Sequence, residues 1–158
     1  MSISLELRLE VQDLMTEYCH TLDDGDLARW PLLFTEACFY QVIPRENHDQ
    51  GLPLATIRCE SRGMLEDRVM AIRETYMFEP RYLRHLTSGL RITAHENGII
   101  SATSNYAVFE TLQSEYTRVF NVGRYLDEIV RDDDRLRFRQ RSCVFDSELV
   151  PNSIVYPI

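Results

Sequence analysis

Hydrophobic residues near the start of the chain recur at the spacing of an amphipathic helix. Five of them follow one another at steps of four, three, four and four: Leu7, Val11, Leu14, Tyr18 and Leu22. Such steps place the side chains on one stripe of a helix, so residues 5–22 are predicted to pack that stripe on the core. The Asp-Asp-Gly-Asp stretch at 23–26 ends this helix, with Gly25 available as its C-terminal cap.

The next third of the chain mixes short helical and strand patterns. A short helical segment holds Leu27, Trp30, Leu33 and Phe34, and Pro31 suits its start because proline disrupts helix interiors. Strands are predicted over 38–44 and 55–60, with a polar loop between them. Ser61 is a suitable N-cap for a helix over about 62–76, and Pro80 ends that region.

From Tyr82 onward the hydrophobic period changes from 3.6 to 2. Four long strands are predicted, over 84–95, 99–113, 116–130 and 135–147. Asn97-Gly98 gives the strongest turn signal between them. Short joins favour an antiparallel meander, because parallel neighbours need a long crossover. We therefore expect an α+β fold, in which helices cover one side of a strongly bent sheet with a cone-like interior.

Composition narrows the classes of function. A chain of 158 residues is expected to form a single domain, residues 1–158. Its net charge of −8 argues against a nucleic-acid partner, which requires a basic surface. No apolar run is long enough for a membrane helix, and Glu6, Arg8 and Glu10 interrupt the place of a signal-peptide core. We expect a cytoplasmic protein.

The potential metal ligands are scattered. The four cysteines, at 19, 38, 59 and 143, lack zinc-site spacing, and reduced, buried thiols are expected. The four histidines, at 20, 48, 85 and 95, are not spaced as a local two-histidine site. The two halves of the Rieske iron–sulfur ligand pattern, C-x-H and C-x-x-H, do not occur in the sequence. We expect no metal and no cofactor in this chain, and its sequence carries no nucleotide-binding glycine motif.

General acid–base chemistry in a buried pocket remains an alternative. The candidate residues are Tyr18, Asp23, His85 and Tyr106, whose pKa values burial could shift into a useful range. A structural role is favoured for each. Tyr18 lies on the apolar stripe, and Asp23 lies in a turn where carboxylates commonly cap helices.

Two features suggest contact with another protein. Arg135, Arg137, Arg139 and Arg141 alternate, so a regular strand would place this arginine row on one face. Such a row could pair with strands of its own sheet, through residues such as Asp127, or with an acidic patch on another subunit. The ending Pro151–Ile158 has no charged side chain, and Ile154, Val155, Tyr156 and Ile158 are expected to be covered by another subunit.

Several stretches together resemble a known family. The segment LDDGDLARWPLLFTEACFYQV resembles the entrance of the scytalone dehydratase, ketosteroid isomerase and nuclear transport factor 2-like superfamily. The match narrows to the small (β) subunits of Rieske-type aromatic ring-hydroxylating oxygenases through five further stretches: LEDRV, RHLTSGLRI, SNYAVFET, FNVGRYLD and RQRSCVFDSELVPNSIVYPI. These stretches span essentially the whole chain. The loop PRENHDQGLPL and the ending VPNSIVYPI look closest to subunits of salicylate or anthranilate hydroxylases.

The resemblance implies a structural subunit without catalytic residues of its own. It implies an α3β3 hetero-hexamer with β–β contacts. The large (α) subunit would carry the Rieske [2Fe-2S] cluster and the mononuclear Fe(II), with electrons from NAD(P)H through a reductase or ferredoxin. Two other readings stay open at this point: a stand-alone dehydratase or isomerase of the same fold, and a module that binds a small apolar ligand.

Overall fold

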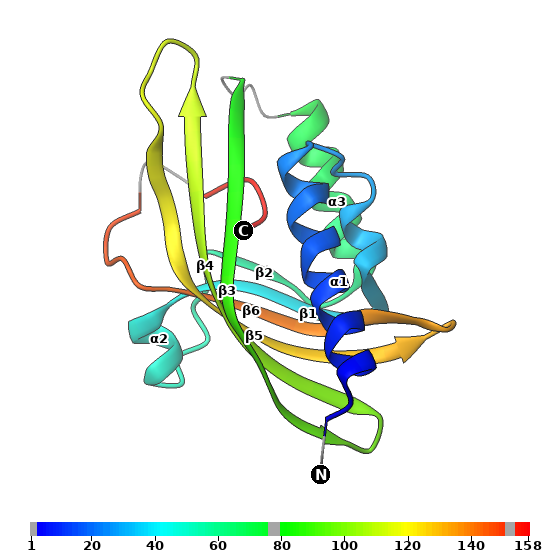
Figure 1. The fold of residues 1–158 in the computed structure, drawn as a ribbon. Helices are drawn as coiled ribbons and strands as arrows, with labels where there is room; N and C mark the ends of the chain where they lie inside the picture. The colour runs from blue at the N-terminus through cyan, green and yellow to red at the C-terminus, as the bar shows by residue number, and fades with distance from the viewer. Residues whose placement is uncertain (1–2, 76–79, 151–153) are drawn as a thin grey trace.

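The computed structural model describes residues 3–75, 80–150 and 154–158, and it confirms the expected α+β fold. The elements, in chain order, are α1 (Leu5–Asp23), η1 (Trp30–Leu33), β1 (Phe34–Pro44), α2 (Arg45–Asp49), β2 (Ile57–Cys59), α3 (Arg62–Glu74), β3 (Arg81–Glu96), β4 (Ile99–Leu112), β5 (Arg118–Asp132) and β6 (Arg135–Phe145). Figure 1 shows α1 and α3 on one side of a long, bent sheet, with α2 on the other side.

The six strands form one sheet in the order β2-β1-β6-β5-β4-β3. Strands β3 to β6 make the predicted antiparallel meander. The sheet is nevertheless mixed, because β1 pairs with β6 in parallel. The curved antiparallel arrangement that was expected of the sheet therefore holds for the meander but not for the β1–β6 pairing. The two strands are far apart in sequence, so the long connection that a parallel pair needs is available.

Bulges interrupt the pairing along the meander. The register shifts between Ser88 and Arg91 on β3, between Val108 and Phe109 on β4, and between Glu128 and Ile129 on β5. A bulge bends its strand and increases the local twist. The sheet therefore curves around the helices instead of lying flat against them (Figure 1).

The helices begin where capping residues place them. The Ser4 hydroxyl accepts a hydrogen bond from the Leu7 amide at the start of α1, and Ser61 does the same for Met64 at the start of α3. Gly25 follows α1 with φ +72°, as expected of a C-terminal cap. The predicted polar loop after β1 instead forms the short helix α2. The last turn of the helix predicted over about 62–76, at Tyr76, lies outside the described residues.

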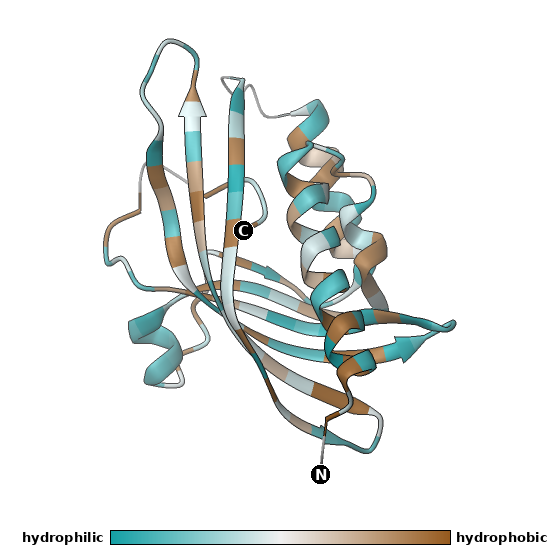
Figure 2. Ribbon diagram, in the orientation of Figure 1, coloured by the Kyte–Doolittle hydropathy of each residue, from teal (hydrophilic) through white to brown (hydrophobic). Residues whose placement is uncertain are grey.

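Aromatic side chains fill the space between α1 and the sheet. Hydrophobic and hydrophilic residues alternate along the strands in Figure 2, as expected for a sheet with one covered face. The largest fully buried rings come from α1, η1 and four strands: Tyr18, Trp30, Phe34, Tyr40, Tyr106, Tyr125, Phe138 and Phe145. Most of them meet edge to face, the favoured arrangement for packed aromatic rings.

Candidate functional site

The predicted arginine row does not lie on one face of β6. Glu128 pairs with Gln140 and Ile129 with Phe138, so Arg139 is an extra residue opposite β5. One extra residue reverses the side-chain alternation beyond it. Arg141 therefore points to the inner face, on the same side as Phe138, and is 0% exposed. The prediction that Arg141 belongs to an exposed docking row was wrong.

Arg141 forms an ion pair deep inside the protein. Its Nε lies 2.8 Å from Oδ1 of Asp127, and one terminal nitrogen lies 2.9 Å from Oδ2. Asp127 is the cross-strand partner that the sequence suggested, but the pair is buried and not solvated. Burial opposes the charge of Arg141, yet the Asp127 carboxylate outweighs it and raises the pKa of the guanidinium.

Aromatic rings enclose this guanidinium. Its central carbon lies 4.1 Å from the ring centre of Tyr18 and 4.0 Å from those of Tyr125 and Phe138. These contacts are cation–π interactions, which strengthen when water is excluded. Arg141 is therefore a structural cation that fills the middle of the cone.

The end of the chain also lies inside the cone. Ile154 is 4% exposed and Ile158 is 0% exposed, so this chain covers both side chains itself. The prediction that another subunit must cover them was wrong. Val155 and Tyr156 are half-buried; the Val155 carbonyl accepts a hydrogen bond from Arg68, and Arg81 lies over the Tyr156 ring. Residues 151–153 lie outside the described part of the chain.

Of the four acid–base candidates, the structure brings two into direct contact. Nδ1 of His85 lies 2.6 Å from Oδ1 of Asp23, and the same carboxylate accepts the His85 backbone amide at 3.0 Å. The histidine side chain is 0% exposed, and its Nε2 has no hydrogen-bond partner among the residues that the structure describes. Tyr106 donates to the Asn121 side chain at 2.7 Å, and Tyr18 donates to the Ile158 backbone oxygen.

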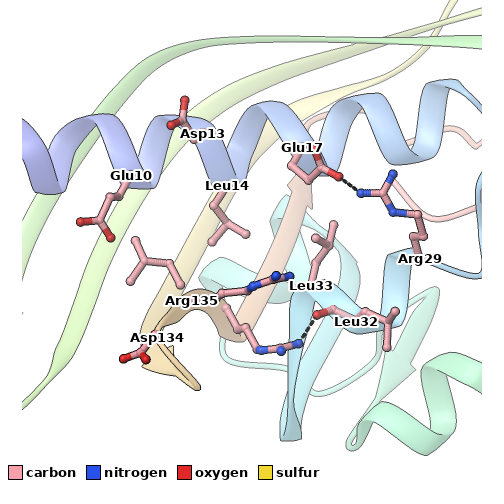
Figure 3. A pocket seen from close by; sticks show the side chains of 11 residues that line it. Glu10, Asp13, Leu14, Glu17, Arg29, Leu32, Leu33, Asp134 and Arg135 are labelled. Atoms are coloured by element: carbon pink, nitrogen blue, oxygen red, sulfur yellow. Dashed lines mark hydrogen bonds and ion pairs between the residues drawn. The ribbon is translucent and has the colours of Figure 1, made fainter.

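The outer end of the arginine row lines a surface groove. The groove has a volume of about 530 Å³ and lies between α1, η1 and the β5–β6 turn (Figure 3). Its apolar floor comprises Leu14, Leu32, Leu33 and Leu136, and the charged rim includes Glu10, Asp13, Glu17, Arg29, Asp134, Arg135 and Arg137. We call this surface the α1–β6 groove.

Ion pairs already engage part of the rim of the α1–β6 groove. Glu17 pairs with Arg29, and Arg137 donates to the Leu32 carbonyl. Arg135 is exposed and makes no ion pair or hydrogen bond with the described residues. The groove therefore offers an apolar floor and an unpaired cation to another molecule.

The described residues do not assemble a metal site. All four cysteines are free and buried, as expected. No group of three or more His, Cys, Asp and Glu side chains lies close enough to hold an ion in the described ranges. Of the helices in those ranges, none has the length and hydrophobicity to cross a membrane.

A buried carboxylate with two arginine partners was not foreseen from the sequence. Glu110, on β4, is 0% exposed and pairs with Arg81 at 2.6 Å and with Arg118 at 2.7 Å. Glu110 occupies an inward position in the alternation of β4. A carboxylate at an inward strand position is the one sequence signal that could have revealed the buried pairing.

The family of the chain follows from comparison with known proteins. Residues 4–142 match the model of the SnoaL-like domain. The chain is 38% identical over 149 residues to the anthranilate 1,2-dioxygenase small subunit of Burkholderia cepacia, covering 94% of this chain and 92% of that protein. The chain belongs to the small-subunit family of aromatic ring-hydroxylating dioxygenases.

Two further relatives agree with this assignment. A terephthalate 1,2-dioxygenase β subunit from Comamonas is 30% identical over 95% of this chain and 97% of its own length. A solved β subunit of a candidate aromatic-ring-hydroxylating dioxygenase from Novosphingobium aromaticivorans superposes with a TM-score of 0.86 at 38% identity, covering 94% of this chain and 95% of that one. The resemblance in the sequence is therefore confirmed at the level of family and fold.

Proposed function

We propose that this small subunit has a structural role and supports assembly of an iron-bearing large subunit. The observation that carries the proposal is the filled interior. The Arg141–Asp127 pair and Ile158 occupy the middle of the cone, where a pocket enzyme would hold its substrate. The chain thus contributes a rigid body and surfaces, and the chemistry belongs to the partner.

The proposed complex acts on an aromatic acid such as anthranilate or salicylate. The relative from Burkholderia cepacia, an anthranilate 1,2-dioxygenase small subunit, supports this substrate class. The large subunit would hold the Rieske [2Fe-2S] cluster and the mononuclear Fe(II), with electrons from NAD(P)H through a reductase or ferredoxin. We propose an α3β3 hetero-hexamer with β–β contacts, located in the cytoplasm.

The proposed docking residues are those that the fold leaves accessible. Arg135 and Arg137 line the α1–β6 groove, and the side chain of Arg139 is 51% exposed. Val155 and Tyr156 are half-buried at the surface of the terminal segment. The side chain of Arg137 is only 18% exposed and pairs with Asp132, and Arg139 pairs with Glu128, so Arg135 is the exposed cation beside the apolar floor. This arrangement suits a partner that brings a carboxylate and apolar side chains together.

Co-expression with a Rieske-type oxygenase large subunit tests the proposal. We expect light scattering to show one complex containing both chains, and turnover of an aromatic acid only in that complex. Arg135→Glu combined with Leu32→Glu should weaken association at least tenfold, because the pair reverses one charge and removes apolar contact. The matched control is Arg84→Glu, another exposed arginine, which lies on β3 away from the groove.

A stand-alone dehydratase or isomerase is the second candidate, and one observation favours it. Within the described part of the chain, the Nε2 of His85 in the buried Asp23–His85 pair has no partner, as expected of the nitrogen of a general base. His85→Ala separates the two functions. If the purified chain alone dehydrates or isomerises a cyclic substrate and His85→Ala lowers that turnover at least a hundredfold, the result would support catalysis, since a positioned base contributes about 10²–10⁴-fold. Turnover of the intact, iron-loaded complex within about twofold, with altered stability, supports the structural role.

A further inference from the structure

The backbone oxygen of Ile158 is surrounded by hydrogen-bond donors. The hydroxyl of Tyr18 donates to it, the hydroxyl of Tyr40 lies 3.3 Å away, and the thiol of Cys143 lies 3.4 Å away. The Ile158 amide donates in turn to the Tyr40 hydroxyl at 2.9 Å. Three side chains thus converge on one acyl oxygen in the dry interior.

These three side chains are held in place by the rest of the fold. They come from α1, β1 and β6, and each is buried. The ring of Tyr18 packs edge to face on Tyr125 and Phe138, and the central carbon of the Arg141 guanidinium lies 4.1 Å from its centre. The terminal segment therefore enters a site whose walls belong to other elements.

The donors are in their protonated form. Burial raises the pKa of Tyr18 and of Tyr40 above its ordinary value, and burial raises the pKa of Cys143 to about 12. Hydroxyl and thiol hydrogens are therefore available at neutral pH to an acceptor placed where the Ile158 oxygen lies.

We propose that Ile158 occupies this site as an internal ligand, and that the emptied site binds a small branched acyl compound. Without Ile158 the hydroxyl and thiol donors would be buried without an acceptor, and an apolar cavity would remain beside them. Each of these two changes destabilises the folded state. A compound with a carbonyl or carboxyl oxygen and a branched aliphatic group would accept hydrogen bonds from the donors and fill the apolar cavity. The terminal segment thus closes a binding site, which is a property beyond the assembly role proposed above.

A chain that ends at Pro157 tests the proposal. The probes are 3-methylpentanamide and 3-methylpentanoate, which distinguish a neutral from an anionic acyl group, and 3-methylpentane, which lacks the oxygen. At a concentration about tenfold above a millimolar Kd, the better acyl probe should raise the midpoint of thermal unfolding by about 3 °C. The hydrocarbon should raise it less, and the intact chain should not respond to any of the three.

Two variants separate the acyl site from any hydrophobic cavity. Tyr18→Phe in the shortened chain should weaken acyl binding about five- to tenfold and leave the hydrocarbon unaffected. Ile154→Ala in the intact chain empties an equally buried position and should show no preference for the acyl probes. Equal stabilisation by hydrocarbon and acyl probes, or a response to neither, overturns the proposal.

If the shortened chain does not fold, Ile158→Gly in the intact chain provides the second test. The backbone oxygen stays in place, so only the volume of the side chain is emptied. The hydrocarbon should then stabilise this variant at least as well as the amide. Preference for the amide, or no response to the hydrocarbon, would contradict an apolar site at this position.

Discussion

At the scale of single residues, the interior depends on one buried charge and its partner. Asp127 and Arg141 are both 0% exposed, and aromatic rings exclude water from the guanidinium. A paired buried charge contributes little net stability compared with apolar residues, but breaking the pair is costly because the remaining charge cannot reach water. The same burial keeps the thiols of Cys19 and Cys143 protonated.

Asp127→Ala should destabilise the fold by about 3–5 kcal/mol, because it leaves the Arg141 guanidinium buried without a counter-ion. Urea unfolding followed by circular dichroism measures the change. Arg139→Ala on β6, the strand of Arg141, removes a half-exposed arginine and should stay within about 0.5 kcal/mol of the parent. Equal, small effects of the two substitutions would mean that the Asp127–Arg141 pair is not sealed from water.

The buried thiols predict how stability changes at alkaline pH. Burial raises the pKa of Cys19 to about 11 and that of Cys143 to about 12, from 9.0. The folded state therefore retains protons that the unfolded state releases, so stability is complete below pH 9.0 and falls as pH rises towards the folded values. Thermal unfolding between these pH values should show the fall, and a Cys143→Ser variant should reduce it. A midpoint that does not change with pH would contradict the raised pKa values.

At the scale of elements, the packing of β5 against β6 shapes the sheet. Their pairing contains the bulge at Arg139, and Gly123 of β5 pairs with Phe145 of β6. A Cβ atom at Gly123 would lie 2.0 Å from the Val144 backbone oxygen, so the two strands approach too closely for any side chain. This glycine is required by the close approach of two backbones.

Gly123→Ala should therefore destabilise the protein by about 3 kcal/mol, since backbone must move to relieve the overlap. Gly63→Ala is the matched control: the position is exposed on α3, and a Cβ there meets only the Ser61 hydroxyl oxygen at 3.8 Å. Alanine within a helix is favoured over glycine by about 0.5–1 kcal/mol, so the control should be more stable than the parent. Chemical denaturation of both variants decides the matter, and a neutral Gly123→Ala would refute the close approach.

At the scale of the whole molecule, a filled cone leaves the surface as the functional part. The α1–β6 groove joins an apolar floor to charges from α1, Arg29, the β5–β6 turn and β6 (Figure 3). The relatives are small subunits of oxygenases, so the expected partner of this surface is the large subunit.

The separately purified chain should bind well under one iron per molecule. Its histidines and cysteines lack the Rieske spacing, and the large subunit is proposed to hold both iron centres. Metal analysis of the folded chain, beside the co-expressed complex as a positive control, measures the difference. Stoichiometric iron with a visible absorption band in the isolated chain would contradict the structural role.

The local elements follow from residues that lie close together in the chain. The apolar stripe of α1, its end at Gly25, the Ser61 cap and the Asn97-Gly98 turn each depend on residues within a few positions of one another. Short-range signals of this kind can be read from the order of side chains alone. The motifs spread along the chain likewise identified the family.

Which side chains lie inside depends on how distant segments pack together. The bulge that turns Arg141 inward depends on how β5 pairs with β6, and it has no sign in the alternating arginines. Ile158 is buried against Tyr18 and Tyr40. Both residues lie more than a hundred positions away in the sequence, so their contact with Ile158 exists only in the folded chain. The parallel β1–β6 pairing and the Asp23–His85 contact also join distant segments. Burial and strand pairing are properties of the packed chain. Local periodicity could therefore predict where the strands lie. It could not predict which side chains face inward after a bulge, or that Ile158 fills the interior of the cone.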